Sequence, residues 1–275
     1  IGKETDLPLS PKTSWQAGPT GTPAVLLDGK ATEIASAGDF EHDQPFTVSF
    51  WIRPPANDSS YAVVARMDDA AKHRGWDAWV QGRRVAMHMV HAWSDDAFKV
   101  VAEAQLPADA WTRVAMTYDG SGKAAGVRVY YDGKPQKLKI ENDTLKQHTI
   151  KTGVPLTIGS RTPGGSAHGV GLTDLAIYGR AFSEAEVIGV SQAQALAGIV
   201  KLPPAERAAA AAGLYDWWLG THDQAFVAAT KTAADLESEI AAIKARGTIA
   251  HVMAEKPGMP TAYTLDRGEY DKRKD

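Results

Sequence analysis

The 275-residue chain contains no cysteine, no long apolar run and no marked excess of one charge. The absence of cysteine excludes disulfides, zinc sites with cysteine ligands and covalent haem attachment through a C-x-x-C-H motif within this sequence. No apolar run approaches the roughly 20 residues that a membrane-spanning helix needs. A formal net charge of -3 gives no electrostatic basis for binding nucleic acid, because such binding neutralises phosphates.

What the sequence does contain is apolar residues in alternation. Residues 111–134, WTRVAMTYDGSGKAAGVRVYYDGK, hold two alternating runs joined by a Gly-rich connection, which predicts an antiparallel hairpin. Residues 45–55 alternate and stop at Pro-Pro, and residues 75–93 predict a second hairpin with Gln81-Gly82 at its centre. Short strands separated by turn signals about every 8–12 residues predict a mainly β fold, an antiparallel sandwich or barrel.

Composition divides the chain into four segments. Pro, Gly and Ser dominate the beginning, and a helical period replaces the alternation after Tyr178, where Ser183 and Glu186 form a capping box. The sequence begins with Ile1, and we expect it to be a piece of a longer polypeptide. The predicted segments are a linker (1–23), the sandwich (24–190), a helical extension (191–247) and an extended tail that leads to a downstream domain (248–275).

Four stretches resemble, in order, the laminin-G-like, concanavalin A-like lectin jelly rolls. They are LDG at 27–29, the PFTVSFWIRP strand, the W-x-x-V-A-M-T-Y-D-G-S hairpin and GVGLTDLAIYGRAFSEAEV at 169–187. The resemblance implies a jelly-roll β-sandwich over roughly residues 24–190. The stretches HMVHAW, YDGSGKAAGV and residues 253–273 resemble, more narrowly, planctomycete-type multidomain surface proteins that also carry a cytochrome c-like domain. That context implies a periplasmic, cell-surface or secreted location and contacts with flanking domains.

The resemblance also implies a metal. Laminin-G-like jelly rolls commonly hold Ca²⁺ on the rim of the sandwich, and the matching positions are Asp28 in LDG and Asp174 in GLTDLAIY. Carboxylate oxygens suit Ca²⁺. The alternatives are a turn residue for Asp28 and an ion pair with Arg180 for Asp174.

Aromatic residues indicate where a ligand would bind. Sugar rings stack their apolar faces on Trp, and nearby polar groups bond the hydroxyls. One hairpin carries three Trp residues with polar neighbours, and we expect the later Gly-rich loop that contains His168 to close over the same region. The candidate ligand-binding residues are therefore Trp76, Trp79, His91, Trp93, Asp95, Asp96 and His168, although some of the Trp residues of a sandwich belong to its core.

Catalytic motifs are not found. A laminarinase-type hydrolase would carry carboxylates at alternate positions of a strand, but the pairs Asp68-Asp69 and Asp95-Asp96 are adjacent and would point to opposite faces. His88 and His91, three apart on a strand, also diverge, which argues against a zinc site from that pair. We expect a non-catalytic module that recognises a polysaccharide or other glycan. A domain-docking module and, less favoured, a divergent glycosidase are the alternatives.

Overall fold

The computed structural model describes residue 9 and residues 13–19, 23–35, 37–200, 202–211, 214–246, 257–258, 264–268 and 273–274. The chain divides into two compact units, Ile1–Trp217 and Trp218–Asp275, and each is described by itself.

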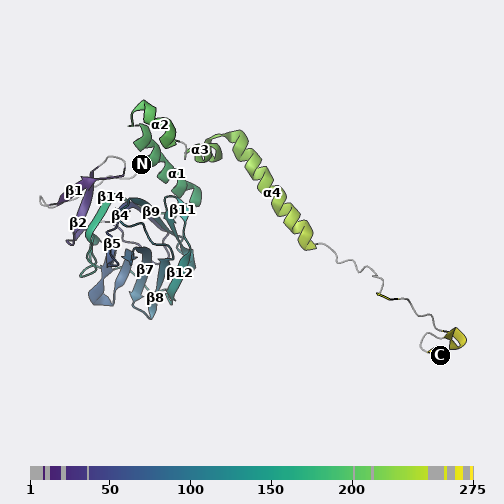
Figure 1. Ribbon diagram of the computed structural model, residues 1–275. Coiled ribbons are helices and arrows are strands. Elements are labelled where there is room, and N and C mark those ends of the chain that lie inside the picture. Colours follow the sequence, from purple (N-terminus) through teal and green to yellow (C-terminus); the bar gives the residue numbers. More distant parts are fainter. Residues whose placement is uncertain are drawn as a thin grey trace. The chain divides into compact units, whose positions relative to one another are not determined.

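The first unit is built on two antiparallel sheets of seven strands (Figure 1), which confirms the predicted sandwich. Sheet A has the order β1 (Ser14–Ala17), β2 (Pro23–Asp28), β14 (His168–Tyr178), β4 (Phe46–Arg53), β9 (Thr112–Tyr118), β10 (Val127–Tyr131) and β11 (Lys134–Pro135). Sheet B has the order β12 (Leu138–Asp143), β8 (Asp96–Ala102), β7 (Arg84–Ala92), β6 (Arg74–Gln81), β5 (Ser60–Asp68), β13 (Leu156–Ile158) and β3 (Thr32–Ile34). Short 3₁₀ turns at Asp69–Ala71 and Ala124–Gly126 complete the unit.

Strand β4 shows why the two sheets pack face to face. Its alternate residues Phe46, Val48, Phe50 and Ile52 are buried in the main core between the sheets. Successive side chains of a strand point to opposite faces, so the intervening Thr47 lies on the outer side of sheet A, where its hydroxyl donates to the Arg180 carbonyl. Each buried Phe or Ile side chain stabilises the fold by about 2 kcal/mol.

The two predicted hairpins are present. Strands β9 and β10 pair antiparallel with Met116 opposite Val129. Strands β6 and β7 pair out to Gln81 opposite Arg84, so the two-residue turn is Gly82-Arg83, one residue later than predicted. Both turn residues have positive φ, 51° and 59°, as the right-handed twist of a tight hairpin requires.

Part of the segment predicted to be a linker is a strand. Residues Ser14–Ala17 form β1, which pairs with β2 and places Trp15 opposite Val25. Residues 1–8, 10–12 and 20–22 of the predicted linker lie outside the described residues. The sandwich of this structure therefore begins before residue 24.

A capped helix covers part of the outer face of sheet A. Helix α1 (Glu184–Val200) follows the predicted capping box, in which the Ser183 backbone N–H donates to Glu186 Oε2 at 2.9 Å. Val187 of this helix packs with Ala115 and Tyr130 of sheet A. Helices α2 (Pro204–Ala211) and α3 (Tyr215–His222) replace the single helix predicted over 205–219.

The second unit contains helix α4 (Gln224–Arg246), which agrees with the helix predicted over 223–246. The Asp223 carboxylate accepts from the Phe226 amide and caps the start of this helix. Two-residue strands β15 (Thr264–Leu265) and β16 (Arg273–Lys274) flank a 3₁₀ turn at Asp266–Gly268, and most of the predicted tail lies outside the described residues. Within the described parts of the chain, no helix combines the length and apolarity needed to cross a bilayer.

Gly75 gives a direct test of how β5 and β6 pair. A Cβ atom at Gly75 would lie 1.9 Å from the Arg66 carbonyl oxygen, and its φ of 131° is unfavourable for any other residue. We therefore expect Gly75→Ala to lower the free energy of unfolding by about 3 kcal/mol or more, measured by urea denaturation. The matched control is Gly153→Ala, where nothing lies within 4 Å of the added methyl, and its effect should stay within about 0.5 kcal/mol. Equal effects of the two substitutions would contradict the pairing.

Candidate functional site

The outer face of sheet B carries a hollow. The strand period places Trp76 and Ala78 of β6 in the main core, and it places Asp77 and Trp79 on the opposite face. Small buried side chains on neighbouring strands, among them Ala62, form a low floor there. The hollow has a volume of about 280 Å³ and is lined by Ser60, Met67, His73, Trp79, Gln81, His88, Val90, Trp93, Lys99 and Arg161.

A fully buried carboxylate, Asp77, holds an ionic network beneath this hollow. His88 Nδ1 lies 2.8 Å from Asp77 Oδ1, which also accepts the backbone N–H of His88 at 3.2 Å. Arg161 donates from Nε to Asp77 Oδ2 at 2.8 Å and forms an ion pair with the same oxygen through Nη2 at 2.5 Å. Each oxygen of the Asp77 carboxylate therefore has a partner: Oδ1 is bonded to His88 and Oδ2 to Arg161.

The pKa of Asp77 shows that the network outweighs its cost of burial. Burial by itself raises the pKa of a carboxyl group, but the charges and hydrogen bonds of His88 and Arg161 lower the pKa of Asp77 to about 2. Asp77 is thus a carboxylate at neutral pH. Removing one partner of such a buried pair costs about 3–5 kcal/mol, because the remaining charge stays buried.

Two Trp side chains flank the network. The Arg161 guanidinium lies over the Trp79 ring at 4.0 Å from its centroid, so one face of this ring is covered by a cation. The Trp93 ring is 39% exposed and meets His88 edge-on, with ring centroids 5.6 Å apart. Trp93 therefore offers the more accessible aromatic surface, and Trp79 is held by Arg161.

The loop after β13 brings Arg161 to this face. Its carbonyl at Gly165 accepts the Ala62 amide of β5, which fixes the loop to that strand. A Cβ atom at Gly165 would lie 2.6 Å from the Trp79 ring, so only glycine allows the loop to come this close. Sequence reasoning missed Arg161 because 84 residues separate it from Asp77 and no local pattern connects them.

Two of the three candidate Trp residues lie at the hollow, and the third lies in the core. Trp79 and Trp93 line the hollow, and their role in ligand binding stays a prediction. Trp76 is 1% exposed on the core side of β6, and its Nε1 donates to the Gly38 carbonyl, so its assignment as a ligand-binding residue was wrong. Its odd spacing from Trp79 puts the two rings on opposite faces of the strand.

The remaining candidates lie elsewhere. The Gly-rich loop does reach the hollow on sheet B through Arg161 and Gly165, but His168 itself belongs to β14 of sheet A, opposite Asp28 of β2. Asp95 is exposed in the turn between β7 and β8. His91 and Asp96 do not line the hollow; they meet His148 beside it.

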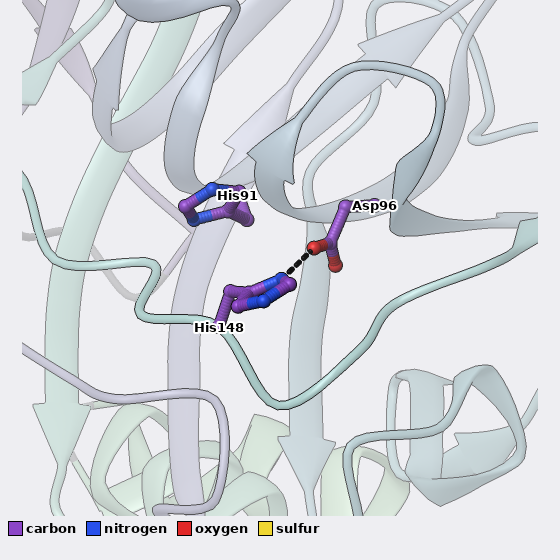
Figure 2. Close-up of side chains that lie close together, drawn as sticks. All are labelled: His91, Asp96 and His148. Atoms are coloured by element: carbon purple, nitrogen blue, oxygen red, sulfur yellow. Dashed lines mark hydrogen bonds and ion pairs between the residues drawn. The ribbon is translucent and has the colours of Figure 1, made fainter.

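His91, Asp96 and His148 form a second cluster (Figure 2), in which one ligand atom from each residue lies within 4.8 Å of the others. His148 Nδ1 and Asp96 Oδ2 are 2.6 Å apart, and Asp96 Oδ1 accepts the Lys146 amide at 2.7 Å. Burial acts to raise the pKa of Asp96, but the hydrogen bonds from His148 and Lys146 hold it below its ordinary value. Sequence reasoning missed His148 because it lies in an irregular loop 52 residues after Asp96.

The two residues predicted to bind Ca²⁺ are not close together. Asp28 Oδ1 accepts the Lys30 amide at 3.1 Å in a local turn. Asp174 Oδ2 lies 2.5 Å from Nη1 of the buried Arg113. Six residues of β14 separate Asp174 from the position opposite Asp28, which is about 20 Å along a strand. Arg113 already neutralises Asp174 and would repel a cation there, so calcium at these positions stays a prediction.

Comparison with known proteins identifies the fold family. A family profile described as the concanavalin A-like lectin/glucanases superfamily, Laminin_G_3, matches residues 28–188. The chain belongs to this superfamily. This confirms the laminin-G-like part of the resemblance, whereas the planctomycete multidomain context stays a prediction. No curated protein matches the chain in sequence.

Several solved structures of binding domains are similar to this chain. The binding domain of Paraclostridial Mosquitocidal Protein 1 is 18% identical and has a TM-score of 0.53, with 70% of this chain and 48% of that one covered. The receptor binding domain of botulinum neurotoxin D is 12% identical with a TM-score of 0.51, over 70% and 48% of the two chains. The CBM40 of a Ruminococcus gnavus IT-sialidase, solved with α2,3-sialyllactose, is 13% identical with a TM-score of 0.50, over 61% and 96%.

At these identities the likeness is one of fold. This chain spans about half the length of the two toxin domains and nearly all of the sialidase module.

The Asp77 network predicts a specific loss of stability in acid. Because the pKa of Asp77 is about 2 in the folded chain and about 3.9 when unfolded, its stabilising contribution is present above about pH 4. It is lost as the pH falls from about 4 to about 2, and it amounts to about 2–3 kcal/mol. Asp77→Asn should therefore be less stable than the unaltered protein at pH 7, and this difference should narrow towards pH 2.

Urea unfolding at pH 7, 4 and 2.5 measures that difference. The control is Asp95→Asn, which removes one exposed carboxylate from the same sheet and should leave the profile unchanged. A difference between the unaltered protein and Asp77→Asn that stays constant over this range would contradict the role given to the Asp77 charge.

Proposed function

We propose that this superfamily member is a non-catalytic carbohydrate-binding module, and that its ligand binds in the hollow on the outer face of sheet B. The observation that carries the proposal is the exposed Trp93 ring standing beside a fixed set of polar groups. The similarity in fold to receptor binding domains and to a sialidase carbohydrate-binding module supports it.

The chemistry of the hollow suits a sugar. A pyranose ring would stack its apolar face on Trp93, and Ser60, Gln81 and His73 would bond its hydroxyl groups. The Asp77 network fixes His88 and Arg161 before any ligand arrives. Groups held in this way lose little conformational entropy on binding, so a small hollow can give useful affinity.

The charge of the hollow favours an acidic glycan. Lys99 and Arg161 line it, and none of the described residues that line it carries a carboxylate. The counter-ion of Arg161 is Asp77, which is buried beneath the surface, while Lys99 pairs with Glu141 of the adjacent strand at 2.8 Å. We therefore propose that a carboxylated sugar binds more tightly than its neutral counterpart.

The same geometry supports a non-catalytic role. A retaining glycosidase needs two carboxyl groups about 5–5.5 Å apart beside the scissile bond. None of the described residues that line the hollow carries a carboxylate, and Asp77 beneath it is fully buried and bonded on both oxygens. We further propose that the module acts within a larger surface or periplasmic protein.

A domain-docking role is the second candidate, and one feature of α4 favours it. The side chains of Leu236, Ile240 and Ile243 are each more than half exposed at a spacing of four and three residues, which places them on one face of the helix. Such a face commonly packs against another protein surface. Docking through α4 and glycan binding by sheet B are compatible.

The glycan proposal is tested with a matched pair of sugars and a matched pair of variants. Isothermal titration calorimetry of the full chain should show tighter binding of α2,3-sialyllactose than of lactose, because these differ by one carboxylated sugar. Trp93→Ala should weaken sialyllactose binding at least tenfold, about 1.4 kcal/mol, through loss of the stacking surface. Trp15→Ala, which removes an exposed Trp from sheet A, is the control and should leave the affinity unchanged.

Binding that is unaffected by Trp93→Ala would place the ligand elsewhere. If neither sugar binds, and a wider panel of acidic and neutral polysaccharides does not retard the protein in affinity gels, then glycan recognition is refuted and docking is left.

A further inference from the structure

We propose that His91, Asp96 and His148 bind a single divalent transition-metal ion of the Zn²⁺ type. The three side chains come from the end of β7, the start of β8 and the loop before β13, and they turn towards one another (Figure 2). One ligand atom from each lies within 4.8 Å of the other two. The cluster shares no residue with the lining of the hollow, so this proposal does not depend on sugar binding there.

The His91 ring is already oriented as a ligand. Its Nδ1 lies 2.7 Å from the Thr149 carbonyl oxygen, which can only accept, so Nδ1 carries the proton. The lone pair therefore sits on Nε2, the other ring nitrogen. Metal-binding histidines are commonly held in this manner, with one nitrogen donating to a carbonyl or carboxylate and the other binding the ion.

The loop that carries His148 is fixed on both sides of it. Before His148, the Lys146 amide donates to Asp96 Oδ1. After it, the Thr149 hydroxyl and the Ile150 amide donate to the Glu41 carboxylate at 2.6 and 2.9 Å. The backbone at residue 148 is thus positioned without any metal, although the side chain itself is 62% exposed.

The remaining movement is small. Ligand atoms around a tetrahedral Zn²⁺, each about 2.0–2.1 Å from the ion, lie about 3.3 Å apart. His148 Nδ1 and Asp96 Oδ2 are 2.6 Å apart, so they need to separate by less than 1 Å for the ion to replace the proton between them. Because the His148 ring is largely exposed and Asp96 is not, we assign this movement to His148.

The ligand types select the metal. Two imidazole nitrogens and one carboxylate oxygen suit Zn²⁺, Co²⁺ and Ni²⁺, whereas Ca²⁺ requires six to eight oxygen ligands. Three protein ligands leave one position of a tetrahedral ion for water. Because the His148 side chain is exposed, solvent can reach that fourth position.

The experiment is an isothermal titration calorimetry measurement in which the tag-free full chain is titrated with ZnCl₂ and, separately, with CaCl₂. We expect one Zn²⁺ per chain with a Kd in the micromolar range or below, no comparable binding of Ca²⁺, and a Tm that rises when Zn²⁺ is in excess. His148→Ala should weaken Zn²⁺ binding at least tenfold, and because His148 is exposed its loss should not prevent folding. His91→Ala should weaken it similarly.

The matched control is His222→Ala in α3, an exposed His that is not a member of the cluster, which should not change the Kd. A second readout is the visible absorption of bound Co²⁺, which should be lost in the His91→Ala/His148→Ala double variant. The proposal is overturned if Zn²⁺ binds more weakly than about 1 mM, or if the double variant binds it as tightly as the unaltered protein. No sugar is present in this titration, so its failure is distinguishable from failure of the glycan proposal.

Discussion

The candidate site depends on the burial of one charged group, the Asp77 carboxylate, on the outer face of sheet B. Burying a charge is unfavourable unless it is paired. Asp77 is tolerated there because Arg161 and His88 bond to both of its oxygens. A buried ion pair is poor evidence for added stability, since an apolar residue of similar volume often serves as well. Its effect here is positional: it ties the loop after β13 to the middle of the sheet, and it sets Arg161 against Trp79.

The main features of the fold were predictable from the sequence because alternation is a local signal. Phe46 to Ile52 in β4 and the pair of runs in β9 and β10 show the period of two that is typical of a strand with one apolar face. The capping box at Ser183 and Glu186 is equally local. Where prediction failed, a tertiary choice decided the outcome: nothing in the sequence says that Ser14–Ala17 would pair with β2 as an edge strand.

The sites were less predictable for the same reason. Trp79 and Trp93 were identified by residue type, but Arg161 and His148 come from loops whose course depends on the finished sandwich. For His91, strand geometry predicted that its side chain would diverge from that of His88. The sequence did not predict that it would lie close to His148. Calcium at Asp28 and Asp174, which the family resemblance implies, stays a prediction, and the cluster of His91, Asp96 and His148 lies on the other sheet.

The position of β14 has a consequence for synthesis. This strand is the last of the sandwich in sequence, but it lies inside sheet A between β2 and β4. Until β14 has been synthesised as far as Tyr178, β2 and β4 each have one edge without a strand partner, which can pair with other chains. Sheet A is therefore completed late and through contacts between residues far apart in sequence, which slows folding and makes chaperone contact valuable to the nascent chain.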